Sequence, residues 1–323
     1  MSRLKIAVLM GGKSSEHEVS LVTGENVIKN LDPAKYEIRP IKISKDNKWI
    51  RQEKEIKIEE ALEGIDAVFN ALHGEYGEDG TIQGILEFLG VPYTGSRILA
   101  SALGMDKVKS RALFRLYGLL TPPNAILTKE TWTKKPEIIK EIIENIKLPA
   151  VVKPVNLGSS VGISIVREKE NFNKAFKNAF ERSDEILLED YIDGREMTCG
   201  VLENFKENKI SALPVTEIIP PEGRFFDYEV KYNGQTQEIT PAEIEPELSK
   251  KIQRIAEEAH QILGCRHYSR VDMIVNEKGI YVLEVNTLPG LTKESLFPKA
   301  AKTAGLEFPA LLEHLIGLAL KNR

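Results

Sequence analysis

The alternation of short apolar runs with helical patterns over residues 1–95 limits the fold of this chain more than any other feature. Apolar runs at 4–10, 36–43 and 65–74 predict strands, and helical spacing of apolar residues follows at 19–31 and 82–89. Such alternation is typical of a parallel sheet covered by helices. Parallel sheets bind ligands beyond the carboxyl ends of their strands. Glycine turns at Gly11-Gly12 and Gly74 lie at that edge, which makes it a candidate site.

The turn after the first strand, "LMGGKSSEHEVS", does not match the common phosphate-binding motifs. A P-loop needs a glycine where this chain has Ala7, and the Gly-x-Gly-x-x-Gly dinucleotide pattern is absent. A helix start attracts anions, but Glu16 and Glu18 oppose an anionic ligand and favour a cationic group such as a substrate ammonium. An N-terminal capping cluster, formed by Ser14 or Ser15 with Glu18, is the alternative.

Size and charge narrow the class of protein. The 323 residues are enough for two or three domains of roughly 150 residues each. A net charge of −4 argues against bulk affinity for nucleic acid. No run approaches the ~18 apolar residues of a membrane span, and Cys199 and Cys265 are far apart in the sequence. We therefore expect a cytoplasmic protein with two reduced core cysteines and no membrane or nucleic-acid partner.

Two segments of the chain do not follow the pattern of strands and helices. The highly charged stretch 45–60 predicts a solvated surface segment. The polar stretch 220–244 lacks clear periodicity, and a segment of that length is either disordered or a functional loop. Helical patterns follow it at 248–263 and at the C-terminal end, with two strands between them.

Those two late strands, "YSRVDMIV" and "GIYVLEVNT", carry polar side chains on otherwise apolar strands. Side chains alternate between the faces of a strand, so Arg270 and Asp272 share one face, as do Glu284 and Asn286. If the strands pair as a hairpin, all four side chains converge. Carboxylate and amide oxygens suit Mg²⁺ better than zinc. The alternative is a surface ladder of salt bridges.

Two lysines lie near a glycine-serine turn. Lys153 follows the apolar run "LPAVV", and the turn "GSSVG" begins five residues later, at Gly158; Lys107 starts a separate helix. Backbone N–H groups of such a turn can hold phosphate, although a glycine-serine turn alone is more often just a hairpin. Together with the expected Mg²⁺, these residues predict a nucleoside triphosphate site without a P-loop.

The motifs "EHEVS", "ALHGEYGEDGTIQG", "GSSVG", "RVDMIV" and "EVNTLPGLTKESLFP" closely resemble the D-alanine–D-alanine ligases of the ATP-grasp superfamily, in family order over nearly the whole chain. The resemblance implies an α/β and α+β fold. A Rossmann-like N-terminal domain over 1–97 precedes a two-lobed ATP-grasp fold. The first lobe covers 98–185, and the second covers 186–323 with a mobile lid loop at about 220–240.

The resemblance also implies roles for individual residues. Those that match ATP-binding residues are Lys107, Lys153, Glu189 at the adenine, the Ile192 backbone, Glu196 at the ribose, and Lys231 in the lid. Those that match ligands of two Mg²⁺ ions, with Mn²⁺ able to replace them, are Asp272, Glu284 and Asn286. Those that match substrate-binding residues are Glu16, His73, Ser295 and Leu296. Those that match residues acting in the reaction are Glu16, Ser159, Tyr232, Arg270 and the Gly290 N–H group.

By the same resemblance, Glu16 binds the ammonium of the first D-alanine and is hydrogen-bonded in a set with Ser159 and Tyr232 that locks the lid. Arg270 and Gly290 stabilise the tetrahedral intermediate. Some family members carry a glutamate before the Gly-Ser-Ser turn, where this chain has Leu157.

The implied reaction joins two D-alanines through a D-alanyl phosphate, with ATP consumed, for peptidoglycan precursor synthesis by a homodimer. Ligases that make D-alanyl-D-lactate differ around the lid tyrosine, so Tyr232 favours the dipeptide. Another ATP-grasp carboxylate–amine ligase and a nucleotide-binding regulator without catalysis are the alternatives.

Overall fold

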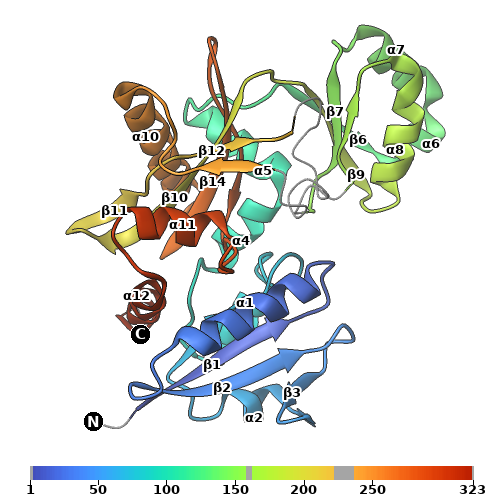
Figure 1. The fold of residues 1–323 in the computed structure, drawn as a ribbon. Coiled ribbons are helices and arrows are strands. Elements are labelled where there is room, and N and C mark those ends of the chain that lie inside the picture. Colours follow the sequence, from blue (N-terminus) through green and yellow to red (C-terminus); the bar gives the residue numbers. More distant parts are fainter. Residues whose placement is uncertain (1–2, 158–161, 222–235, 322–323) are drawn as a thin grey trace.

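A computed structural model describes residues 3–157, 162–221 and 236–321 of the chain and has a mixed α/β fold with three sheets (Figure 1). The N-terminal unit, drawn in blue, lies below a six-stranded sheet, and a four-stranded sheet with its helices forms a separate lobe at the upper right. Ser159, Lys231 and Tyr232, and most of the predicted lid, lie outside the described residues.

The first sheet has the strand order β4-β3-β2-β1-β5. Strands β2 (Tyr36–Ile43) and β5 (Ala67–Asn70) flank β1 (Leu4–Gly11) in parallel, and helices α1 (His17–Asn30) and α3 (Thr81–Phe88) follow β1 and β5. Both faces of β1 are buried, as expected for a parallel strand covered by helices. The parallel arrangement is confirmed for these three strands, although β5 ends at Asn70, short of the predicted Gly74.

The charged stretch 45–60 is largely exposed, as predicted, and it also has regular structure. It forms a hairpin of β3 (Trp49–Arg51) and β4 (Lys54–Ile56), followed by α2 (Ile58–Leu62), and β3 extends the sheet antiparallel to β2. Trp49 is buried in the same apolar cluster as Ile41 and Ile43. One tryptophan anchors the hairpin, while the charged residues around it face outward.

The second sheet is antiparallel with the order β6-β9-β7-β8. Its strands are β6 (Asn124–Thr128), β7 (Ala150–Pro154), β8 (Ser164–Val166) and β9 (Glu185–Asp190), and its helical elements are α6 (Lys129–Lys134), α7 (Pro136–Asn145), η1 (Lys169–Asn171) and α8 (Phe172–Phe180). Phe172, Phe176 and Phe180 of α8 pack into this core. The sheet continues to the end of β9 at Asp190, beyond the expected lobe boundary at 185.

Two helices connect the first unit to this lobe. The helix predicted near residue 107 is α5 (Lys107–Leu116), and Asp106 caps it by accepting from the N–H groups of Val108 and Lys109 at 2.9 and 3.0 Å. The sequence analysis did not predict the preceding helix α4 (Ile98–Met105).

The third sheet has the order β13-β12-β10-β14-β15, with β11 paired to β10, and every pairing is antiparallel. Its strands are β10 (Arg195–Phe205), β11 (Asn208–Ala212), β12 (Thr216–Ile219), β13 (Gln237–Ile239), β14 (Tyr268–Asn276) and β15 (Gly279–Asn286). The predicted helix α10 (Pro246–Leu263) packs on this sheet and ends at Gly264, whose φ of +68° suits glycine.

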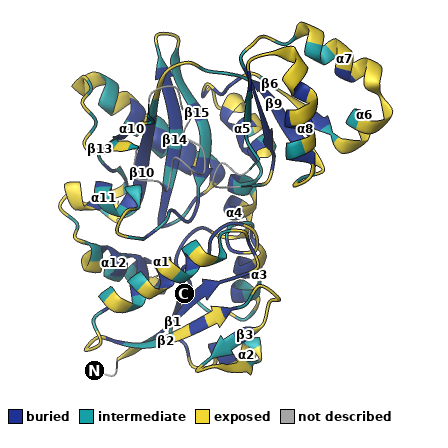
Figure 2. Ribbon diagram, turned by 45° about the vertical axis from the view of Figure 1, so that its right-hand side comes forward, coloured by how far each residue is buried: buried dark blue, intermediate teal, exposed yellow. Residues whose placement is uncertain are grey.

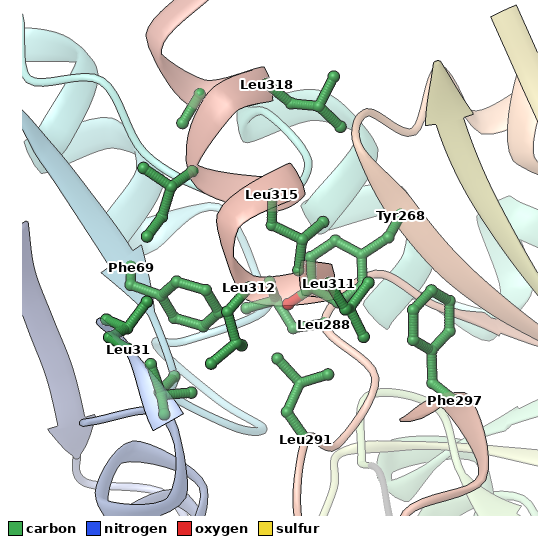
Figure 3. Close-up of a cluster of buried hydrophobic side chains, with 14 of the residues drawn as sticks. Leu31, Phe69, Tyr268, Leu288, Leu291, Phe297, Leu311, Leu312, Leu315 and Leu318 are labelled. Carbon is green, nitrogen blue, oxygen red and sulfur yellow. The ribbon is translucent and has the colours of Figure 1, made fainter. Parts of the chain in front are cut away.

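The chain ends in α11 (Leu296–Thr303) and α12 (Phe308–Lys321). Leu312 and Leu315 of α12 lie in one apolar cluster with Phe69 of β5 and Tyr268 of β14 (Figure 3). The last helix therefore shares a core with both the first sheet and the third. The four-stranded lobe has a separate core, and its helices α6 and α7 are largely exposed (Figure 2).

Both cysteines are free and buried, as predicted. Among the described residues, no single helix is long and apolar enough to cross a membrane; only α11 and α12 taken together, bent by 101°, reach that length and composition.

Candidate active site

One cavity of about 540 Å³ lies where the three sheets meet. Every predicted site residue within the described part of the chain lines it. These residues are Glu16, His73, Lys107, Lys153, Glu189, Ile192, Glu196, Arg270, Asp272, Glu284, Asn286, Gly290, Ser295 and Leu296. The three remaining predicted residues, Ser159, Lys231 and Tyr232, lie outside the described residues.

The polar hairpin at one wall of the cavity has the predicted register. β14 and β15 pair so that Arg270 is opposite Asn286 and Asp272 is opposite Glu284. Asp272 accepts hydrogen bonds from Nε and Nη2 of Arg270 at 2.9 and 2.8 Å, and from Nδ2 of Asn286 at 3.0 Å. Thr198 of β10 also donates to it, at 2.6 Å. Arg270, Asp272, Glu284 and Asn286 line the cavity, so the alternative of a solvated surface ladder is wrong.

Burial alone would lower the pKa of Arg270, but the carboxylate of Asp272, with Glu284 and Glu78 behind it, raises that pKa above its usual value. The guanidinium is therefore a fixed positive charge. Its carboxylate partner holds it in one orientation.

The donor set of this wall fits a hard divalent cation. Asp272 and Glu284 contribute carboxylate oxygens, and the amide nitrogen of Asn286 is used on Asp272, so its oxygen is the atom suited to a metal. Within the described residues, no three His, Cys, Asp or Glu side chains converge as a metal cluster. Mg²⁺ is commonly held by one or two carboxylates plus substrate phosphates, and that arrangement needs no larger cluster.

Two buried ammonium groups line the cavity, and each is paired with an acid. Lys107, at the start of α5, places its Nζ 3.1 Å from Oε2 of Glu284 and donates to the Leu157 carbonyl at 2.7 Å. Lys153, on β7, places its Nζ 2.7 Å from Oε1 of Glu189. Because Leu157 contacts Lys107 through its backbone, a side-chain difference from the family at this position leaves that hydrogen bond possible.

The sequence analysis missed Arg111, which is fully buried on α5. Its guanidinium forms an ion pair with Glu189 and donates from Nε and Nη2 to the Leu283 carbonyl at 3.1 and 3.0 Å. Residues four apart share a helix face, so the spacing from Lys107 to Arg111 was the signal available in the sequence.

The buried group of Glu189, Lys153 and Arg111 has an excess of positive charge, because one carboxylate contacts two cations. Burial would raise the pKa of Glu189, but Arg111 and then Lys153 hold it below its usual value, so the acid is ionised. Burial, together with the like charge of Arg111, lowers the pKa of Lys153 to about 8. Ile192 and Glu196 line the cavity beyond Glu189, in the turn after β9 and at the start of β10.

Comparison with known proteins identifies the family. The model of the D-ala D-ala ligase C-terminus matches residues 113–317, and the model of the N-terminus matches 5–63 and 52–96. This chain belongs to the D-alanine–D-alanine ligase family.

Relatives and solved structures extend that similarity over the whole chain. D-alanine–D-alanine ligases of Pelotomaculum thermopropionicum and Syntrophobacter fumaroxidans are 43% and 42% identical to it, and each alignment covers 99% of this chain and 98% or 99% of the relative. The ligase of Bacillus anthracis complexed with ATP superposes with a TM-score of 0.81 at 37% identity, covering 99% of this chain and 98% of that one. VanG D-Ala:D-Ser ligase of Enterococcus faecalis gives 0.85 at 36% identity, covering 98% and 100%.

In this ATP-dependent ligase, no serine side chain caps the helix that follows the turn after β1. Helix α1 begins at His17 and has Glu16 as its N-cap residue without a side-chain capping bond. The hydroxyl of Ser14 instead donates to the His73 carbonyl at 2.6 Å and accepts from the Glu16 N–H at 3.2 Å. Glu18 is exposed and lies 3.6 Å from Lys45. The capping alternative is therefore wrong, and Glu16 lines the cavity.

A second acid, Glu78, joins His73 beside Glu16. His73 is buried, with Nε2 2.9 Å from the Thr23 hydroxyl and Nδ1 3.6 Å from Oε1 of Glu78. Burial opposes protonation, yet Glu78 and Glu16 raise the pKa of His73. Glu78 also accepts from the Gly74 N–H at 2.9 Å. Sequence reasoning missed Glu78 because it is one of several acids in the same turn.

The residues matched to the second-substrate pocket lie before and at the start of α11. The Ser295 hydroxyl is 2.8 Å from that of Thr292 and accepts from the Thr292 N–H at 3.0 Å. A Cβ at Gly290 would come 2.8 Å from the Ser295 oxygen, so a side chain there would displace it. Lys299, one turn into α11, is 2.9 Å from Glu238.

Proposed function

We propose that this ligase joins two D-alanine molecules through a D-alanyl phosphate, using ATP, and so makes a peptidoglycan precursor in the cytoplasm. The observation that carries the proposal is that one cavity brings these groups together. It combines an acid suited to an ammonium, two lysines suited to phosphates, and an arginine beside oxygen ligands. The membership of the chain in the D-alanine–D-alanine ligase family supports the same reaction.

ATP would lie along the side of the cavity formed by β7, β9 and β15. We assign the phosphates to Lys107 and Lys153, the adenine to Glu189 and the Ile192 backbone, and the ribose to Glu196, with Lys231 as a further ATP contact outside the described residues. Asp272, Glu284 and Asn286 would hold two Mg²⁺ ions, which neutralise phosphate charge when bound. Phosphoryl transfer depends mainly on such positioning and charge neutralisation.

The first D-alanine would bind through its ammonium to Glu16, near His73. Its carboxylate attacks the γ-phosphate, which gives D-alanyl phosphate and ADP. The amine of a second D-alanine, held near Ser295 and Leu296, then attacks the acyl carbon, and phosphate leaves.

Arg270 and the Gly290 N–H would stabilise the oxyanion of that second step. Asp272 accepts from only Nε and Nη2 of the guanidinium, and Nη1 of Arg270 donates to no acceptor among the described residues, so it can serve the oxyanion. Ser159 and Tyr232 are assigned with Glu16 to the set that closes the site.

The test is ADP and phosphate release from ATP and Mg²⁺ with D-alanine or L-alanine, with the product identified by mass spectrometry. We expect ADP and phosphate to be released with D-alanine but not with L-alanine, and the product to be D-alanyl-D-alanine. ATP binding without release would favour the regulator, and release with other amino acids would favour another ATP-grasp ligase.

D-serine is the specific alternative to D-alanine as the second substrate, because the similar VanG protein is a D-Ala:D-Ser ligase. Competition of D-serine and D-lactate with D-alanine in the same assay measures this preference, and we expect the dipeptide to dominate. We also propose a homodimer, which light scattering of the purified ligase tests.

A further inference from the structure

Arg111 joins the two lobes that border the ATP side of the cavity. It extends from α5 and contacts Glu189 on β9, in the four-stranded sheet, and the Leu283 carbonyl on β15, in the six-stranded sheet. Leu283 directly precedes Glu284, one of the residues assigned to the metal. A single buried guanidinium thus connects the acid assigned to adenine with the strand assigned to Mg²⁺.

The same guanidinium also keeps the buried Glu189 carboxylate paired with a cation. Lys153 lies 2.7 Å from Glu189, and both side chains are almost completely buried. A lysine that turns toward a phosphate must lengthen or break that contact. A buried carboxylate left without a cation is strongly destabilised. Arg111 is the second cation on Glu189, so the acid stays paired while Lys153 moves.

We propose that Arg111 is a positioning residue for ATP: it keeps Glu189 paired and correctly placed while Lys153 engages the phosphates. The inference rests on the proposed function, because the ATP contacts of Glu189 and Lys153 belong to it. Arg111 itself touches neither the reacting atoms nor the cavity as described.

The geometry calls for arginine in particular. Three nitrogens of the side chain are used, Nη1 on Glu189 and Nε with Nη2 on the Leu283 carbonyl. A lysine has one nitrogen and a different reach, so it can restore the charge beside Glu189 but not the whole fork. Arg111→Lys therefore keeps a positive charge beside Glu189 but loses the connection between the lobes, so it tests the two contributions separately.

The test compares Arg111→Met with Arg115→Met. Arg115 lies one turn further along α5 and bonds Thr121 and Asn124, at 3.0 and 2.9 Å, and none of these three residues lines the cavity. The dissociation constant of ATP with Mg²⁺ is measured by calorimetry without D-alanine. Because one charge-assisted contact is lost or misplaced, we expect about 10- to 100-fold weaker ATP binding for Arg111→Met and near wild-type binding for Arg115→Met.

Kinetics give a readout that a merely structural role would not produce. We expect the KM for ATP to rise in Arg111→Met while the KM for each D-alanine changes little, and Arg111→Lys to recover part of the loss. Equal ATP affinity in the wild type, Arg111→Lys and Arg111→Met overturns the proposal, as does a parallel rise in all Michaelis constants. If Arg111→Met does not fold, the ATP affinity of Arg111→Lys decides in the same way.

Failure of the proposed function is distinguishable from failure of this inference. A wild-type protein that binds ATP but makes no D-alanyl product contradicts the function, while the calorimetric comparison still judges Arg111. A wild-type protein that does not bind ATP overturns both.

Discussion

Replacing Gly74 by alanine should displace Glu16, the acid proposed to bind the first substrate. Gly74 has a φ of +70°, and a Cβ built on it would lie 2.8 Å from Oε2 of Glu16 and 3.2 Å from Cβ of Ser14. Ordinary contacts of this kind are 3.4–4 Å. Ser14 is tied to the His73 carbonyl, whereas the carboxylate is the end of a flexible side chain. We therefore expect Glu16 to move.

Two free energies set the size of the effect. A residue with a Cβ in the left-handed region is destabilised by about 1–2 kcal/mol, which lowers the free energy of unfolding. A misplaced carboxylate loses a charge-assisted contact with the ammonium of about 1.5–3 kcal/mol. By the tenfold-per-1.4 kcal/mol rule, the affinity for the first D-alanine falls roughly 10- to 150-fold.

Gly90→Ala is the matched control. Gly90 has a φ of +67° in the same unit, and a Cβ there would meet nothing within 4 Å. Both variants should lose similar stability by thermal melting. In initial-rate assays at saturating ATP, only Gly74→Ala should show a raised KM for the first D-alanine. If both variants depend on D-alanine as the wild type does, the carboxylate is not positioned by this contact and the reasoning is refuted.

Four further outcomes follow from the site. Glu16→Gln should raise the KM for the first D-alanine by the same factor and leave that for ATP almost unchanged; a loss of stability alone would contradict the assignment. Asp272→Asn should lose most turnover while its circular dichroism stays native, and near-normal turnover at saturating Mg²⁺ would sink the metal assignment. Burial lowers the pKa of Lys153 to about 8, so its ammonium group in the free ligase is deprotonated as the pH rises through that value. The kcat/KM for ATP should therefore fall above about pH 8. A flat profile of kcat/KM to pH 9.5 would exclude Lys153 as the titrating group. Burial raises the pKa of the thiols of Cys199 and Cys265, so neither should react with a thiol reagent until the ligase is unfolded, and a fast native reaction would show that burial to be wrong.

Local periodicity was sufficient where the site is built from regular elements. The two-residue alternation of β14 and β15 predicted that Arg270, Asp272, Glu284 and Asn286 share a face, and the strand register confirms it. Helical spacing likewise predicted α10 and its end at Gly264.

Contacts between distant segments were not predictable in the same way. Ser14 resembles a helix cap locally, but it bonds a carbonyl 59 residues away. Trp49 appears isolated among charged residues until Ile41 and Ile43 cover it. Arg111 resembles any helical surface arginine until Glu189, 78 residues further on, pairs with it. The roles of individual site residues and the domain boundaries remain predictions.

The position of α12 has a consequence for how the chain is made. Leu312 and Leu315 complete the core that Phe69 of the first sheet faces. During synthesis on a ribosome, this apolar face emerges before its covering helix α12. The N-terminal unit therefore cannot complete its core as an independent domain, and its uncovered face is exposed to aggregation until α12 has been made. For this ligase, the unit that carries Glu16 and His73, proposed to bind the first substrate, is fully packed only once α12 is in place.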